Sequence, residues 1–202
     1  MHRCTCTNHC RRPLTPIARK IDVRTRLILS MLLLAPILAA GAGSGVWLDV
    51  PYIHQEKEGC GSAALAMVLQ YWNQKGAALS AERIDAEKIQ RELYSKGAHG
   101  IRASAMERYL RESGFAPFIF RGEWKDLTTH IEKGRPLIAS IQPGGKSSLH
   151  YVVVVGVEQE GQAVLLNDPE RGKLFRVERS EFEKEWVRAD NWTLLAVPKP
   201  AE

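Results

Sequence analysis

Cysteine is scarce in this sequence once its first few residues are passed. Cys4, Cys6 and Cys10 lie at the very start, and Cys60 is the one cysteine in the rest of the chain. A lone thiol cannot form an internal disulfide, which excludes a small disulfide-stapled scaffold for the body of the protein. The early cysteines and His9 resemble a metal-binding cluster only weakly, so we predict no metal site there.

Long hydrophobic runs are also lacking, which excludes a protein with several membrane spans. The longest apolar run covers residues 27–40 and is interrupted by Pro36, whereas a spanning helix needs roughly 20 apolar residues. Arg24 and Arg26 precede the run, and small residues ending at Ala42 follow it, as in a secretory signal peptide. We therefore predict an N-terminal extension and signal peptide over 1–42 and one domain over 43–202.

This organisation predicts an exported protein, periplasmic or extracellular. If the signal is not cleaved, the same run would instead anchor the chain in the membrane; after cleavage, we expect no stable span. Of 28 Lys and Arg and 23 Asp and Glu, seven basic residues and one acidic residue precede residue 43, which leaves 21 basic against 22 acidic. The predicted mature chain thus lacks the basic patch of a nucleic-acid-binding protein, and we exclude nucleic acid as a partner.

Hydrophobic periodicity predicts an α+β domain. Apolar residues surround the segment 62–72, as in a helix buried on nearly all sides. Further helices are predicted over 80–94, 104–113, 123–133 and 180–186, and strands over 135–141, 150–158, 162–168, 173–178 and 192–198. Helices thus come first and an antiparallel sheet second, and we expect two packed layers.

Cys60 begins the buried helix, directly after a polar loop. A free thiol in an exported chain needs a reason, and burial, an intermolecular bridge and reactivity all remain open. The first turn of a helix favours an anion, hence the thiolate, which is the nucleophilic form of cysteine. Gly61 would leave the adjoining backbone uncovered for a substrate.

A nucleophilic thiol needs a base, and His150 is the strongest candidate. The other three histidines after residue 42 lie in polar loops or on a charged helix, where a solvated imidazole is common: His54, His99 and His130. His150 instead opens the most apolar strand, directly after a flexible glycine-containing loop.

Hairpin geometry points to an orienting acid for this base. A turn around Glu160–Gly161 would place residues 168–170 opposite His150 across two antiparallel strands, close enough for side chains to interact. Asp168 falls in that span, although Asn-Asp before a proline is also typical of a plain turn. Gln55, on the loop leading to Cys60, is a candidate oxyanion donor together with the Cys60 backbone N–H.

This order of residues resembles the papain-like cysteine peptidases that process the double-glycine leaders of bacteriocins, and their stand-alone relatives. The resemblance extends from "VPYIHQEKEGCGSAALAMVLQYW" through "HYVVVVGVEQEGQAVLLNDPERG" to "SEFEKEW". It implies a papain-like fold with Cys60 as nucleophile, His150 as general base, Asp168 as orienting acid and Gln55 in the oxyanion hole. It implies a peptide or protein substrate and no cofactor or metal.

Two features are closer to the stand-alone relatives than to the exporter-fused enzymes. They are the spacing from Gln55 to Cys60 and the presence of Gly59, where the fused enzymes usually have an acidic residue. This sequence also contains no ATP-binding or transporter segment, so a double-glycine substrate is not assumed.

The leading hypothesis is therefore an exported cysteine peptidase. A non-catalytic module that holds an extended peptide in the same groove is one alternative. A cell-wall amidase or an acyl transferase is another, because a thiol, a base and an oxyanion hole serve any acyl transfer. The sequence does not predict the oligomeric state.

Overall fold

The computed structural model describes residues 45–145, 148–158 and 161–200. The predicted signal segment and the three early cysteines lie outside these ranges. None of the helices in the described ranges combines the length and the apolar character needed to cross a bilayer.

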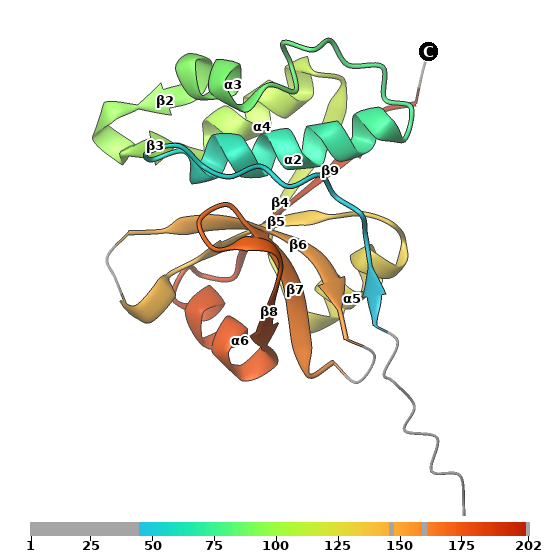
Figure 1. Ribbon diagram of the computed structural model, residues 1–202, viewed down its shortest axis with the longest axis vertical. Coiled ribbons are helices and arrows are strands. Elements are labelled where there is room, and N and C mark those ends of the chain that lie inside the picture. Colours follow the sequence, from blue (N-terminus) through green and yellow to red (C-terminus); the bar gives the residue numbers. More distant parts are fainter. Residues whose placement is uncertain (1–44, 146–147, 159–160, 201–202) are drawn as a thin grey trace, which may run out of the picture. The chain divides into compact units, whose positions relative to one another are not determined.

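One antiparallel sheet organises the domain (Figure 1). Its strands lie in the order β4-β9-β5-β6-β7-β8, and short β1 pairs with the end of β6. Their bounds are β1 (Val46–Trp47), β4 (Phe115–Arg121), β5 (Leu137–Ile141), β6 (His150–Val157), β7 (Ala163–Asp168), β8 (Gly172–Glu178) and β9 (Trp192–Pro198). A separate hairpin joins β2 (Tyr94–Ser95) to β3 (Gly100–Ile101) through a 3-10 turn, η1 (Lys96–Ala98).

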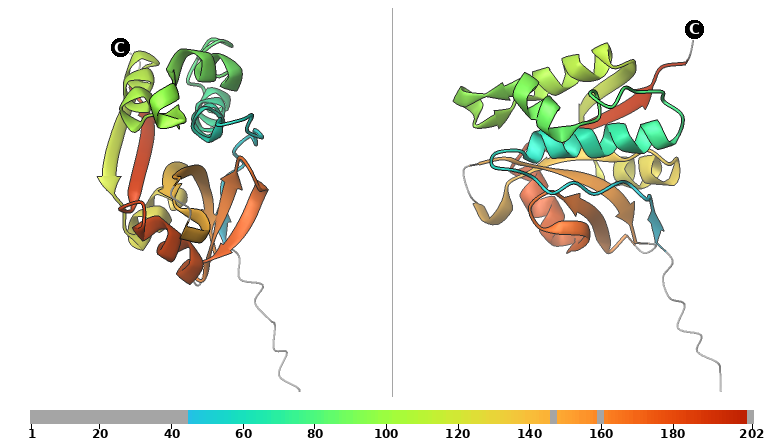
Figure 2. Two further views of the ribbon diagram at one scale, coloured as in Figure 1. Left: turned by 90° about the vertical axis from the view of Figure 1, so that its left-hand side faces the viewer. Right: turned by 45° about the horizontal axis from the view of Figure 1, so that its top comes forward.

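Helices cover both faces of the sheet (Figures 1 and 2). One side carries α2 (Cys60–Gln74), α3 (Ala86–Leu93) and α4 (Ala103–Glu112), and the other carries α5 (Trp124–Glu132) and α6 (Arg179–Val187). Alternate residues of β6 serve the two cores, because Val153 and Val155 pack with the α2 side while Val152 and Val154 pack with the α5–α6 side. The predicted α+β class is confirmed, but the sheet has helices on two faces rather than one.

One predicted helix boundary was wrong, and one long strand was missed. The helix expected from residue 80 begins at Ala86, because the Asp85 side chain, and not Ser80, accepts the Lys88 N–H at 2.8 Å and caps the helix. The strand β4 was not predicted. It carries Pro117 and lies at the edge of the sheet, where a missing N–H is tolerated.

The buried helix α2 was predicted correctly, and its burial fixes the start of the helix. Residues 61–69 and Tyr71 are all buried, so α2 runs through the core between the sheet and α3, with α4 beside it over β4 (Figure 2). A helix enclosed in this way cannot shift or rotate without repacking the core. Its first residue, Cys60, is therefore held at a defined place.

Asn167 links three chain segments and is fully buried. Its Nδ2 donates to the Val50 carbonyl at 3.0 Å, and its Oδ1 accepts the Leu174 N–H at 3.1 Å. Leu174 has a φ of +53°, which the hydrogen bond helps to hold.

We expect Asn167→Ala to lower the free energy of unfolding by about 2–4 kcal/mol, because the buried Val50 carbonyl and the half-buried Leu174 N–H both lose their partner. Urea unfolding of wild type and variant measures this loss, and Asn191→Ala, at a half-buried asparagine elsewhere, serves as a comparison. A loss below about 0.5 kcal/mol at Asn167, the size typical of a surface substitution, would contradict this role.

Candidate active site

Cys60 occupies the first turn of α2 and is half-buried. The N-cap is Gly59, and no side chain caps the helix. The Ser62 hydroxyl instead donates to the Gly59 carbonyl at 2.9 Å, and the first helical bond runs from the Ala63 N–H to the same oxygen at 3.0 Å. The N–H groups of the first turn therefore remain available to an anion.

Gly61 has a different role from the one expected. It is buried rather than open to a substrate. A Cβ at this position would lie 2.8 Å from the Met106 Cε and 3.1 Å from the Ile101 Cβ. The missing side chain thus lets β3 and α4 pack closely against the residue after Cys60.

His150 and Asp168 are in direct contact. The His150 Nε2 lies 2.7 Å from the Asp168 Oδ1, and both side chains are buried. In the β6–β7 register Val153 pairs with Asn167, so Asp168 is a diagonal neighbour of His150 rather than its direct partner. Because Nε2 is engaged by the carboxylate, Nδ1 is the ring nitrogen left to face Cys60.

Asp168 is itself held by the turn that follows it. Its Oδ1 also accepts the backbone N–H groups of Glu170 at 2.9 Å and Arg171 at 3.3 Å. Burial alone would raise the pKa of Asp168, but the hydrogen bond to His150, the charge of His150 and these backbone donors lower it overall. Asp168 is therefore ionised at neutral pH.

The protonation of His150 reflects both of its neighbours. Burial by itself lowers the pKa of this imidazole, whereas hydrogen bonds to Asp168 and Cys60, together with their negative charges, raise the pKa to about 9. The imidazole is therefore positively charged at neutral pH, and it lies next to the Cys60 sulfur. The structure therefore brings Cys60, His150 and Asp168 into one electrostatic unit.

Gln55 lies on the loop that leads to α2. Its backbone N–H donates to the Pro169 carbonyl at 3.0 Å, so the loop is tied to the turn that holds Asp168. Its Oε1 is buried and has no hydrogen-bond partner among the described residues. The side-chain amide of Gln55 therefore has an oxygen that makes no hydrogen bond within the described residues.

Tyr151 and Arg171 were missed at the sequence level. Burial, followed by the charge of Cys60, raises the pKa of Tyr151 to about 12, so this ring adjoins the thiol. The Arg171 Nε lies 3.6 Å from the Asp168 Oδ2. Their positions in the sequence, directly after His150 and three residues after Asp168, were the available signal.

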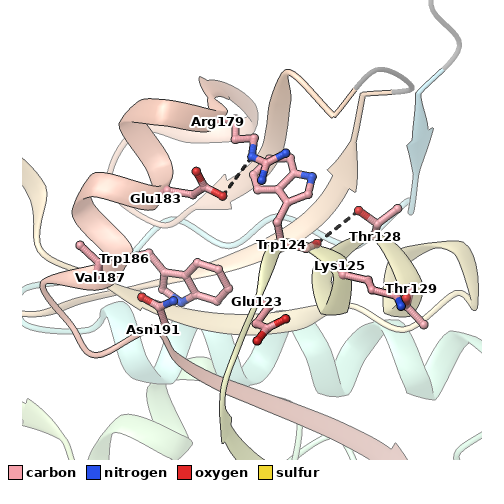
Figure 3. A pocket seen from close by; sticks show the side chains of 10 residues that line it. All are labelled: Glu123, Trp124, Lys125, Thr128, Thr129, Arg179, Glu183, Trp186, Val187 and Asn191. Atoms are coloured by element: carbon pink, nitrogen blue, oxygen red, sulfur yellow. Dashed lines mark hydrogen bonds and ion pairs between the residues drawn. The ribbon is translucent and has the colours of Figure 1, made fainter.

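A cavity of about 720 Å³ lies elsewhere, between α5 and α6 (Figure 3). Two of its charged side chains form an ion pair, in which the Arg179 Nε contacts the Glu183 Oε1 at 3.0 Å, and the Arg179 guanidinium also lies over the Trp124 ring at 4.5 Å. The cavity is on the sheet face opposite α2 and contains none of the four predicted site residues. Within the described ranges, no three His, Cys, Asp or Glu side chains are grouped to bind a metal.

Solved structures share this fold. A structure described as a C39-like peptidase from Bacillus anthracis has a TM-score of 0.58 at 20% identity, with 78% of this chain and 100% of that chain covered. A double glycine motif protease from an AMS/PCAT transporter, solved with its leader peptide, has a TM-score of 0.57 at 24% identity, with 76% and 94% covered. The peptidase domain of Streptococcus ComA has a TM-score of 0.57 at 22% identity, with 73% and 98% covered.

Sequence comparison gives the family. No curated protein matches the chain. The sequence model of the Peptidase_C39 like family matches residues 47–193, which contain Gln55, Cys60, His150 and Asp168. The resemblance inferred from the motifs is confirmed, and the chain belongs to the Peptidase_C39 like family.

Proposed function

We propose that this protein is a cysteine peptidase that hydrolyses peptide bonds with Cys60 as nucleophile. The observation that carries the proposal is the position of His150, which binds Asp168 through Nε2 and is charged through its interaction with both Asp168 and Cys60. A base oriented by an acid and paired with a thiol is the arrangement that activates a nucleophile for acyl transfer. Membership of a peptidase family supports the peptide bond as the target.

Acylation begins with attack of the Cys60 sulfur on the carbonyl carbon. The C=O electron pair moves to oxygen, and the resulting oxyanion accepts hydrogen bonds from the Cys60 N–H and the Gln55 side-chain amide. The His150 imidazolium then donates its Nδ1 proton to the amine nitrogen. The C–N bond breaks, the amine leaves, and a thioester on Cys60 remains.

Deacylation reverses the roles of the same groups. Neutral His150 takes a proton from water, the hydroxide oxygen attacks the thioester carbonyl, and a second oxyanion forms in the same place. Its collapse breaks the C–S bond, releases a carboxylic acid and restores the thiolate–imidazolium pair. Asp168 holds the ring throughout through its hydrogen bond to Nε2.

Gln55→Ala is expected to lower kcat for peptide hydrolysis by about 10²–10³-fold with little change in KM, because one oxyanion donor acts only in the transition state. Gln55→Glu should lose at least as much, since its carboxylate repels the oxyanion. Steady-state kinetics measure both variants, and Lys57→Ala, at an exposed side chain on the same loop, is the matched control. An increase in KM with unchanged kcat would place Gln55 in substrate binding instead.

The proposal as a whole is tested with a panel of extended peptides, some containing a Gly-Gly pair. The Gly-Gly peptides are included because the AMS/PCAT neighbour is a double glycine motif protease that was solved with its leader peptide. Mass spectrometry of wild type and Cys60→Ala after incubation should show cleavage products with the wild type alone, and acid quenching should trap an acyl adduct on Cys60. Tight binding of peptides that are never cleaved would favour the non-catalytic module.

We also propose that the protein acts after export. The support is the signal-like layout that ends at Ala42 and the single cysteine that follows it. N-terminal sequencing of the protein purified from an expressing cell should begin near residue 43. A start that includes residues 24–42, in the membrane fraction, would indicate an anchored protein instead.

A further inference from the structure

The turn before Cys60 contains a residue in an unusual backbone conformation. Glu58 has a φ of +55°, in the left-handed region that favours glycine. The Gly59 N–H closes this turn by donating to the Glu56 carbonyl at 2.9 Å. Because α2 has no side-chain cap, this turn sets the direction in which the first helical residues, and hence Cys60, are presented.

Three side chains hold Glu58 in this conformation. The Gln90 Nε2 of α3 donates to the Glu58 carbonyl at 3.3 Å. The Tyr94 hydroxyl of β2 donates to the Glu58 Oε2, and the His99 Nδ1, after η1, lies 3.3 Å from the Oε1. Both carboxylate oxygens and the backbone carbonyl are thus engaged by residues 32–41 positions later in the sequence.

The same hairpin also contacts the other side of Cys60. Ile101 of β3 packs against Gly61, because a Cβ added at Gly61 would lie 3.1 Å from the Ile101 Cβ. The β2–β3 hairpin therefore meets the nucleophile's turn twice, through polar contacts to Glu58 and through apolar packing against Gly61. Cys60 lies between these two points of attachment.

We propose that Glu58 is a positioning residue, whose carboxylate attaches the β2–β3 hairpin to the nucleophile's turn and so fixes the Cys60 sulfur and N–H relative to His150. This inference rests on the proposed function, because it assigns Glu58 a part in the same reaction. Glu58 itself touches neither substrate nor the transferred proton. Its effect is on the geometry of the oxyanion hole and of the thiolate pair, in which a displacement of about 1 Å lowers the rate by up to about 100-fold.

The test compares three substitutions in the full chain. Glu58→Gly removes both side-chain bonds but tolerates the positive φ, so it isolates the carboxylate. We expect kcat to fall by about 10- to 100-fold with KM within about twofold of wild type. Glu58→Gln keeps an acceptor for Tyr94 and should retain at least about half of kcat, while Lys57→Gly, next to Glu58, controls for added chain flexibility.

The rate of Cys60 alkylation by iodoacetamide is measured on the same variants and needs no substrate. It should fall in Glu58→Gly and remain near wild type in Glu58→Gln and Lys57→Gly. Unchanged kcat and alkylation in Glu58→Gly would overturn the inference, as would a change confined to KM, or losses that Glu58→Gln shares and that parallel the loss of thermal stability. If the wild type cleaves no peptide, the peptidase proposal fails, and the alkylation rates still decide the role of Glu58.

Discussion

Replacing Cys60 with alanine is expected to lower kcat/KM for peptide hydrolysis by about 10⁴–10⁶-fold, because no other group can form the acyl intermediate. Cys60→Ser should be almost as impaired. A serine hydroxyl stays protonated, and an imidazolium beside it cannot accept its proton. Both rates are measured with a peptide that the wild type cleaves. The residual rate should stay above that of uncatalysed hydrolysis, because substrate binding and the oxyanion hole remain.

Two controls separate loss of chemistry from loss of fold. Cys60 is half-buried and its removal leaves the core of α2 intact, so both variants should melt within a few degrees of wild type. His130→Ala removes an imidazole on α5, on the opposite face of the sheet, and should keep its activity. A Cys60→Ala protein that retains more than about a tenth of the wild-type rate would remove Cys60 from the mechanism.

Asp168→Asn is expected to give the second largest effect, a loss of about 10²–10⁴-fold in kcat together with a displaced pH profile. Asp168 raises the pKa of His150, which reaches about 9 in the wild type. The imidazolium is therefore present below that pH, and the wild-type activity should decline as the pH rises through about 9. Without the carboxylate the pKa of His150 falls, so this decline should begin at lower pH.

The profile of kcat/KM against pH tests the displacement, because it reports ionisations of the free enzyme. Arg171→Ala is a useful comparison, since it removes a cation near Asp168 but leaves the His150 contact in place. An unchanged basic limb in Asp168→Asn would show that the carboxylate does not control the His150 proton.

The same shifts predict how stability depends on pH. His150 has a raised pKa in the folded state, so its contribution is fully present below its unfolded pKa and is lost as the pH rises through about 9. Asp168 has a lowered pKa, so its contribution is present above its unfolded value and is lost in acid. The pair therefore stabilises the fold most at pH values above the unfolded pKa of Asp168 and below the unfolded pKa of His150.

Much of the fold could be predicted because its strongest elements carry a clear period. The apolar residues on nearly all sides of α2 predict a buried helix, and the continuous β-branched run of β6 predicts a buried strand. β4 was missed because an edge strand that contains Pro117 and exposes Phe118 has neither a regular alternation nor a continuous apolar run. The start of α3 was misplaced because Ser80 and Asp85 are both good N-cap residues, and the helix uses Asp85.

Contacts within the candidate site could be predicted where residues are related by simple geometry. A hairpin of known turn brings Asp168 within reach of His150 even with the diagonal offset, and the first turn of a helix specifies the environment of Cys60. Glu58 could not be found in this way. Its partners Tyr94 and His99 follow a helix and a turn whose path no local pattern specifies, and its positive φ is not expected of a glutamate.

The rate of Cys60 alkylation by iodoacetamide between pH ~5 and ~10, in wild type and His150→Ala, tests the thiolate–imidazolium pair most directly. Wild type should react readily at pH ~6, well below the pH ~8.5 at which a free cysteine ionises, and His150→Ala should lose this reactivity. The same pH profile in both proteins, rising only near pH ~8.5, would mean that Cys60 is a structural cysteine and would favour the non-catalytic peptide-binding module.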